Sequence, residues 1–110
     1  AGKGRALCDL FVALVDERLA GFGVTLATPR DGSLRGSHVS LRHPEAFGIV
    51  RALIARGIVG DFRSPDAMRF GFAPLYIRFV DVFDAVAAME EVLKREAWRD
   101  LAPVEAGAVT

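Results

Sequence analysis

The sequence predicts an α+β domain in which a small, largely antiparallel sheet of about four strands, arranged as two hairpins, is covered on one face by three helices. Apolar residues recur at helical spacing in three separate stretches of the chain. Between these stretches lie alternating or β-branched segments that are broken by turn-forming residues. The length of 110 residues and the apolar share of 52% suffice for one core and one domain. The predicted order of elements is therefore α-ββ-α-ββ-α.

The first helix is predicted from about residue 7 to residue 19. Its charged residues fall on the face opposite the apolar one, which is the pattern of a helix that covers a core. Gly21 and Gly23 follow, and we expect them to end the helix because glycine adopts a left-handed backbone without strain. The apolar face comprises Leu7, Leu10, Phe11, Leu14, Val15 and Leu19.

The first hairpin is predicted between residues 24 and 42. Residues 24–28 are β-branched and apolar, and residues 29–33 carry turn-forming proline, aspartate and glycine. In residues 35–42 the apolar Val39 and Leu41 alternate with polar neighbours. This pattern predicts a half-buried second strand.

The second helix and the second hairpin follow the same logic. Pro44 suits the first turn of a helix, where a missing N–H costs nothing, and Gly57 is expected to end that helix. Residues 58–62 and 67–72 are strand candidates, joined by turn-forming residues at 63–66. The apolar face of the helix comprises Phe47, Val50, Leu53 and Ile54.

The third helix is predicted by an amphipathic stripe from Phe79 to Leu93. Asp81 and Asp84 lie near its N-terminus, and we interpret them as N-cap and first-turn residues that interact with the helix dipole. The domain is predicted to end shortly after this helix, and we assign residues 1–96 to it. The remainder, 97–110, has no periodicity in its later part and is expected to be a mobile tail.

The charge balance argues against two classes of partner. Lys and Arg together number 14, as do Asp and Glu, and no basic stripe alternates with aromatic residues, so nucleic acid is not an expected partner. Charges interrupt every apolar run, so no membrane span and no signal peptide are expected, and we predict a cytoplasmic protein.

Cys8 is the sole cysteine and is interpreted as a small buried apolar residue. A mean hydropathy of +0.29 predicts apolar surface that docks elsewhere.

Histidine does not predict a metal site in this chain. His38 and His43 are the only two histidines, and no third ligand follows at a suggestive spacing. We therefore expect both side chains to be structural or exposed. No metal is predicted.

Arg69 is the candidate binding residue. Its neighbours Met68 and Phe70 should face the core, so strand alternation presents the guanidinium on the opposite face, near the small Gly71 and Ala73. A planar guanidinium on a rigid strand can hold a carboxylate with two parallel charge-assisted hydrogen bonds. The ordinary alternative is a strand arginine that pairs with a surface Asp or Glu. Spacing alone leaves both interpretations open.

Four stretches resemble bacterial kynureninases. They are RGSHVSL at 35–41, GIVGDFR at 57–63, MRFGFAPLY at 68–76 and RFVDVFDAV at 78–86. The likeness covers most of residues 5–95. It implies the C-terminal small domain of an aspartate-aminotransferase-like, fold-type-I enzyme that depends on pyridoxal phosphate.

The resemblance also implies an activity and a role for one residue. The family hydrolyses L-kynurenine, or 3-hydroxykynurenine, to anthranilate (or its hydroxy derivative) and L-alanine in tryptophan catabolism and NAD biosynthesis. The arginine of its R-F-G-F-x-P-L-Y stretch binds the substrate α-carboxylate, and by position this is Arg69. No catalytic and no cofactor-binding residue is expected in this chain.

The same resemblance implies partners outside the chain. Pyridoxal phosphate would be bound mainly by a large domain that is missing here, because neither Lys3 nor Lys94 lies in a motif that resembles the cofactor lysine's. We therefore expect the chain to be inactive alone, and its apolar surface to pack on the large domain. The resemblance also implies that the full-length protein is a homodimer.

Three alternatives remain at this point. The chain could be the small domain of a cysteine desulfurase-like or aminotransferase-like enzyme, which also binds a carboxylate with an arginine. It could be a free-standing regulatory module that binds an amino acid, although such domains repeat strand-helix-strand units. A purely structural interaction domain is the third, and it predicts that Arg69 is held in a surface ion pair.

Overall fold

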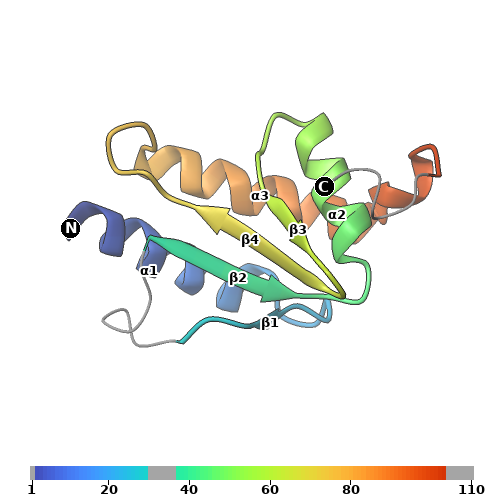
Figure 1. Ribbon diagram of the computed structural model, residues 1–110, viewed down its shortest axis with the longest axis horizontal. Coiled ribbons are helices and arrows are strands. Elements are labelled where there is room, and N and C mark those ends of the chain that lie inside the picture. Colours follow the sequence, from blue (N-terminus) through green and yellow to red (C-terminus); the bar gives the residue numbers. More distant parts are fainter. Residues whose placement is uncertain (1, 30–36, 104–110) are drawn as a thin grey trace.

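The predicted fold class is confirmed in the computed structural model, which describes residues 2–29 and 37–103. Three helices and four strands follow one another in the predicted order, with a short 3-10 helix after them (Figure 1). The elements are α1 (Gly2–Arg18), β1 (Thr25–Leu26), β2 (His38–Arg42), α2 (Ala46–Ala55), β3 (Asp61–Arg63), β4 (Ala67–Gly71), α3 (Phe79–Arg95) and η2 (Ala97–Asp100).

The four strands form one antiparallel sheet in the order β1-β2-β4-β3. The two predicted hairpins are its outer pairs, and β2 and β4 join them along five residue pairs, from His38 opposite Gly71 to Arg42 opposite Ala67. β2 and β4 are therefore the two inner strands, and each is bonded to a neighbour on both sides.

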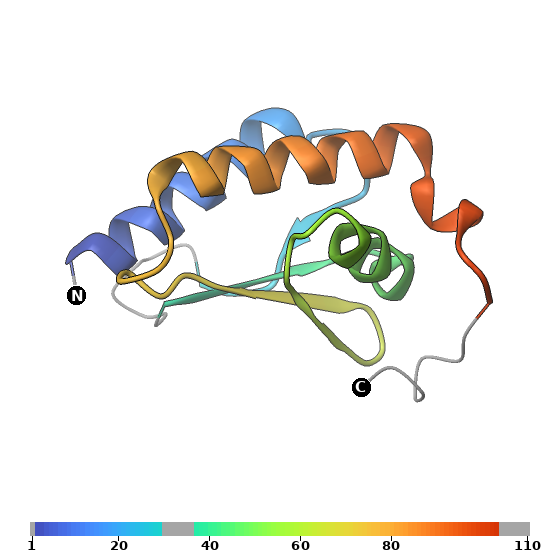
Figure 2. The same cartoon turned by 90° about the horizontal axis from the view of Figure 1, so that it is seen from above.

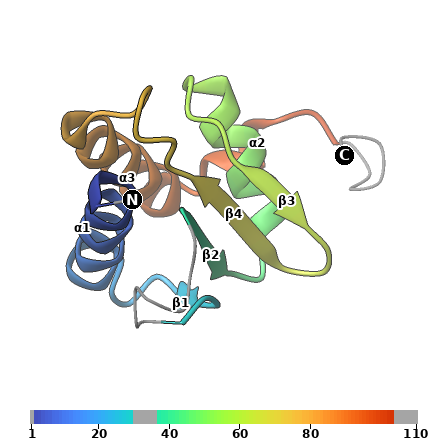
Figure 3. The same cartoon turned by 60° about the vertical axis from the view of Figure 1, so that its left-hand side comes forward.

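All three helices cover the same face of the sheet (Figure 2). Helices α1 and α3 lie side by side, whereas α2 covers β3 and β4 (Figure 3). Across the described ranges, no helix is long and apolar enough to cross a membrane. Among the described residues, no helix or strand covers the other face of the sheet.

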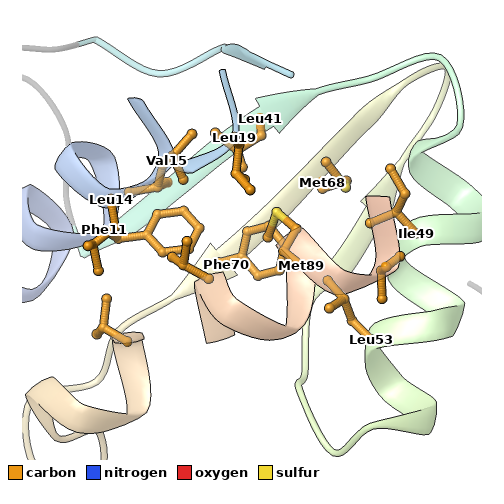
Figure 4. Packing of buried hydrophobic residues seen from close by; sticks show 14 of the residues in the cluster. Phe11, Leu14, Val15, Leu19, Leu41, Ile49, Leu53, Met68, Phe70 and Met89 are labelled. Atoms are coloured by element: carbon orange, nitrogen blue, oxygen red, sulfur yellow. The ribbon is translucent and has the colours of Figure 1, made fainter. Parts of the chain in front are cut away.

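The core lies between the sheet and the helices. Val39 and Leu41 from β2, and Met68 and Phe70 from β4, are buried there as strand alternation predicts. Figure 4 shows Leu41, Met68 and Phe70 in this cluster. The ring of Phe11 on α1 contacts that of Phe70, with 5.4 Å between ring centroids. Cys8 is also fully buried in this apolar cluster, as predicted.

A glycine turn brings the chain from α2 to the edge of the sheet. Gly57 has φ +83° and donates its N–H to the carbonyl of Ile54, while Ile58 donates to Leu53. These two bonds form a Schellman motif, which uses a left-handed residue to end a helix. Residues 58–60 connect this turn to the sheet, so β3 begins at Asp61 rather than at the predicted residue 58.

Other boundaries also differ from the prediction. β1 spans only two residues, because it pairs with β2 at Thr25 and Leu26 alone. Helix α1 begins at Gly2 and ends at Arg18, and the left-handed Gly21 and Gly23 follow it as expected. The predicted turn at 29–33 falls mostly outside the described residues.

The N-terminus of α3 requires a correction. The N-cap is Arg78, Asp81 is the third residue of the helix, and Asp84 lies in its second turn, so neither aspartate is the N-cap. The backbone N–H of Arg78 donates to Asp81 Oδ2 (2.7 Å), and its guanidinium donates from Nη2 to Oδ1 (3.1 Å). These bonds, the guanidinium contact first, lower the pKa of Asp81 below its usual value.

The start of the expected tail is part of the folded unit. Residues 97–100 form η2, and Trp98 packs against Gly48 of α2 and lies 6.0 Å from the His43 ring. The indole offers a large apolar area, so its burial on α2 stabilises this turn. Residues 104–110 lie outside the described residues, so the mobility of the tail stays a prediction.

Candidate functional site

Arg69 lies in the middle of β4, opposite Ser40 of β2 on one side and Asp61 of β3 on the other. Its neighbours Met68 and Phe70 are buried in the core. The Arg69 side chain is 38% exposed. Strand alternation therefore places it as the sequence predicted, on the face opposite the one that α1, α2 and α3 cover.

The guanidinium of Arg69 forms an ion pair with Asp61. Its Nη2 donates to Asp61 Oδ2 at 3.2 Å. The same oxygen lies 3.9 Å from Nη2 of Arg63, so the carboxylate stands between two guanidinium groups. Arg69 Nε is buried without a hydrogen-bond partner, and no other group in the described ranges binds this side chain.

A pocket of about 510 Å³ opens beside this ion pair, between the sheet, the loop before β3 and the N-terminal half of α3. This volume is within the range of small-molecule sites. Arg69 is the only lysine or arginine among the described residues that line it. Three carboxylates also line it: Asp61 pairs with Arg69, Asp81 pairs with Arg78, and Asp84 is the third. The pocket therefore has both a guanidinium and carboxylates in its lining.

The two histidines have the structural or exposed character that was predicted. His43 Nε2 lies 2.9 Å from the carbonyl of Phe22, and its Nδ1 accepts the N–H of Glu45 at 2.9 Å. Since Nδ1 is the acceptor, Nε2 carries the proton and donates. His38 is exposed on β2 and lines the pocket. In the part of the chain that the structure describes, no three His, Cys, Asp or Glu side chains are grouped to hold a metal ion.

Apolar surface lies next to the pocket, on the loop after β4 and on the first turns of α3. Leu75 and Tyr76 are 89% and 81% exposed. Phe79, Val80 and Phe83 follow them and are also exposed. We call these five residues the apolar surface. Large apolar side chains gathered in this way are typical of an interaction site.

The two lysines of this chain lie away from the pocket. The chain has two lysines, Lys3 and Lys94. Lys3 is exposed at the start of α1, and Lys94 Nζ lies 3.7 Å from Glu90 Oε2 near the end of α3. Neither lines the pocket.

Together, these features define an α+β domain in which one arginine, Arg69, lines a pocket beside exposed apolar surface. The family model described as "Kynureninase C-terminal domain" matches residues 1–89, which include Arg69 and the whole sheet. The chain therefore belongs to the family of kynureninase C-terminal domains.

Curated relatives agree with this assignment. The chain is 52% identical over 96 residues to the kynureninase of Pseudomonas fluorescens, which covers 87% of the chain. It is 54% identical over 97 residues to the kynureninases of Burkholderia mallei (strain SAVP1) and Burkholderia pseudomallei (strain K96243), which covers 88% of the chain. In each case it spans 23% of the length of the relative.

Asp61 was not singled out from the sequence, although the GDFR stretch that contains it was. Its significance depends on the register of the second hairpin, which pairs Asp61 with Arg69, Phe62 with Met68 and Arg63 with Ala67. A turn centred on Pro65 predicts this register. The turn residues at 63–66 thus carried a signal that could have identified the pair.

Proposed function

We propose that this chain is the part of a kynureninase that binds the α-carboxylate of L-kynurenine or 3-hydroxykynurenine through Arg69. The observation that carries the proposal is the position of Arg69, the one arginine or lysine among the described residues that line a pocket in a domain of this family. The proposed reaction of the complete enzyme is hydrolysis of kynurenine to anthranilate and L-alanine.

The chemical role proposed for Arg69 is to bind and orient. A guanidinium can donate two parallel hydrogen bonds to a carboxylate, which fixes the direction of the rest of the substrate. Because β4 is bonded to strands on both sides, the backbone that carries Arg69 is held in place. A substrate fixed in this way loses less entropy on the path to the transition state.

The ion pair with Asp61 is compatible with both structural and binding roles. A purely structural domain predicts such a pair, and the pair is present. However, it uses only Nη2 of the guanidinium, which leaves further donors for a ligand. The kynureninase relatives favour the binding role over the purely structural one, and kynureninase over the desulfurase and aminotransferase alternatives.

The proposed cofactor is pyridoxal phosphate, held by parts of the enzyme outside this chain. The family supports the choice of cofactor, and the positions of Lys3 and Lys94, away from the pocket, support its being held elsewhere. We also propose that the apolar surface packs against those other parts, because the chain spans only 23% of its relatives' length. If the cofactor is held elsewhere, the chain alone is inactive. We also propose that the complete enzyme is a homodimer.

The experiment is steady-state kinetics of the full-length enzyme with L-kynurenine, followed by anthranilate fluorescence. Arg69→Ala should lower kcat/KM by roughly 10² to 10³, because it removes a charged partner of the substrate. Arg42→Ala is the matched control. Arg42 is also a strand arginine in an ion pair, at 3.0 Å from Asp66, and lies outside the pocket. Wild-type kinetics in Arg69→Ala would refute the role.

A further inference from the structure

We propose that Asp61 is a positioning residue that holds the Arg69 guanidinium ready for the substrate carboxylate. The inference rests on the proposed function, and assigns a role to a residue beside the binding arginine. Asp61 acts through Arg69 and is not a catalytic residue.

The contact between the two residues is imposed by the sheet. β3 and β4 lie side by side in the sheet (Figure 1). Asp61 and Arg69 are direct partners in this antiparallel pair, so their side chains leave the sheet next to each other on the same face. The Schellman turn at Gly57 and the following residues deliver Asp61 to that position. The end of α2 and the register of β3 with β4 therefore determine that the Asp61 carboxylate lies beside Arg69.

A restrained arginine is a better receptor than a mobile one. Arginine has several rotatable bonds, and ordering them at the moment of binding reduces affinity. The bond from Nη2 to Asp61 Oδ2 restrains the guanidinium before substrate arrives. It engages one of the two terminal amino groups, so Nη1 stays available.

The charges that contact Asp61 differ from those of the pocket as a whole, which Asp81 and Asp84 also line. The carboxylate lies between the guanidinium groups of Arg63 and Arg69, at 3.9 Å and 3.2 Å. One negative and two positive groups leave this cluster with a net positive charge. Its exposure of 60% also means that water screens the negative charge.

Positioning and simple charge repulsion predict opposite changes in KM when Asp61 is replaced. If Asp61 only repelled the substrate carboxylate, neutralising it would strengthen substrate binding. If Asp61 positions Arg69, removing it must weaken binding. The direction of the change in KM therefore distinguishes the two.

The test uses the full-length enzyme with Asp61→Asn, Asp61→Ala, Arg69→Ala and the Asp61→Ala/Arg69→Ala double variant. We expect Asp61→Ala to raise KM for L-kynurenine roughly 3- to 30-fold with kcat changed far less, and Asp61→Asn to show a smaller rise because its amide oxygen still accepts a hydrogen bond. In the Arg69→Ala background, Asp61→Ala should add no further loss. Asp66→Ala removes an aspartate from a comparable exposed pair and is the control.

A second readout separates positioning from a structural effect. Kynuramine is kynurenine without the α-carboxylate, so its inhibition constant should be the same in wild type, Asp61→Ala and Arg69→Ala. A merely misfolded site would weaken both ligands. If Asp61→Ala folds poorly, Asp61→Asn still keeps the volume of the side chain. The direction of the change in KM in Asp61→Asn then tests the proposal by itself.

The outcomes are distinguishable. Wild-type kinetics in Arg69→Ala would remove the proposed function itself. A severe loss in Arg69→Ala with an unchanged or lower KM in both Asp61 variants would overturn only the role of Asp61. A loss from Asp61→Ala that persists in the Arg69→Ala background would also overturn it, because Asp61 would then act independently of Arg69.

Discussion

Gly48 shows how a single residue admits the end of the chain to the fold. It lies on α2, where a Cβ atom would come within 2.5 Å of Trp98 Cβ. The atom that it would meet is next to the backbone, so rotation of the indole cannot remove the clash. The absence of a side chain at this position allows η2 to pack closely on α2.

We predict that Gly48→Ala lowers the free energy of unfolding of this chain. Overpacking costs about 1 to 3 kcal/mol, and the better helix propensity of alanine returns at most about 1 kcal/mol. Because the 2.5 Å contact is shorter than real Cβ atoms show, we expect an overpacking cost of about 2 to 3 kcal/mol and a net loss of about 1 to 2 kcal/mol, measured by urea denaturation. Gly2→Ala is the control, since a Cβ there meets nothing within 4 Å. Equal stability of wild type and Gly48→Ala would contradict this account of the packing.

At the scale of elements, the start of α3 is stabilised by its own acidic residue. Asp81 accepts the backbone N–H of the N-cap, Arg78, together with its guanidinium. The N-terminus of a helix has unpaired N–H groups and a partial positive charge, and both favour a carboxylate. This end of α3 borders both the pocket and the apolar surface, so its order affects both.

We predict that Asp81→Asn lowers the thermal midpoint of this chain at pH 7. The folded-state pKa of Asp81 is depressed, first by the Arg78 guanidinium and then by the Arg78 backbone N–H. Its contribution is therefore full above the unfolded pKa near 3.9 and is lost as pH falls through the lower folded value. The midpoints of wild type and variant should converge over that acidic range.

The control for this prediction is Asp84→Asn. Asp84 lies one turn further along α3 and accepts no hydrogen bond from the described residues. Its substitution should change the thermal midpoint less at pH 7. A gap between wild type and Asp81→Asn that is the same at pH 7 and at pH 2 would argue against stabilisation by the ionised carboxylate.

At the scale of the whole molecule, the apolar surface distinguishes the chain alone from the chain within its proposed enzyme. Leu75 and Tyr76 are almost fully exposed and contribute little to the core of this domain. If the rest of the enzyme covers them, the same side chains become part of an interdomain interface.

We predict that Leu75→Ser/Tyr76→Ser acts differently on the two forms. The free energy of unfolding of the isolated chain should change by no more than about 0.5 kcal/mol, because exposed positions tolerate substitution. The full-length enzyme should instead unfold at a lower temperature, because buried apolar contacts are lost. Thermal unfolding of both proteins makes the comparison. Equal effects in the two forms would show that this surface is not covered.

The local sequence determined the elements and the face on which Arg69 lies. Three apolar stripes specified the helices, and Met68 and Phe70 determined which face of β4 is buried, since side chains alternate along a strand. The stretch around Arg69 also identified the family, as the family match confirms. All of these depend on residues that are close together in the chain.

Tertiary structure alone decided which residues stand beside Arg69. The joining of β2 to β4, the arrangement of pocket walls from the sheet and α3, and the packing of Trp98 on α2 bring together residues far apart in the chain. Asp61 is closer, but its contact with Arg69 follows from the exact point where α2 ends and β3 begins. Local periodicity does not specify such pairings, because they form only when whole elements pack against one another.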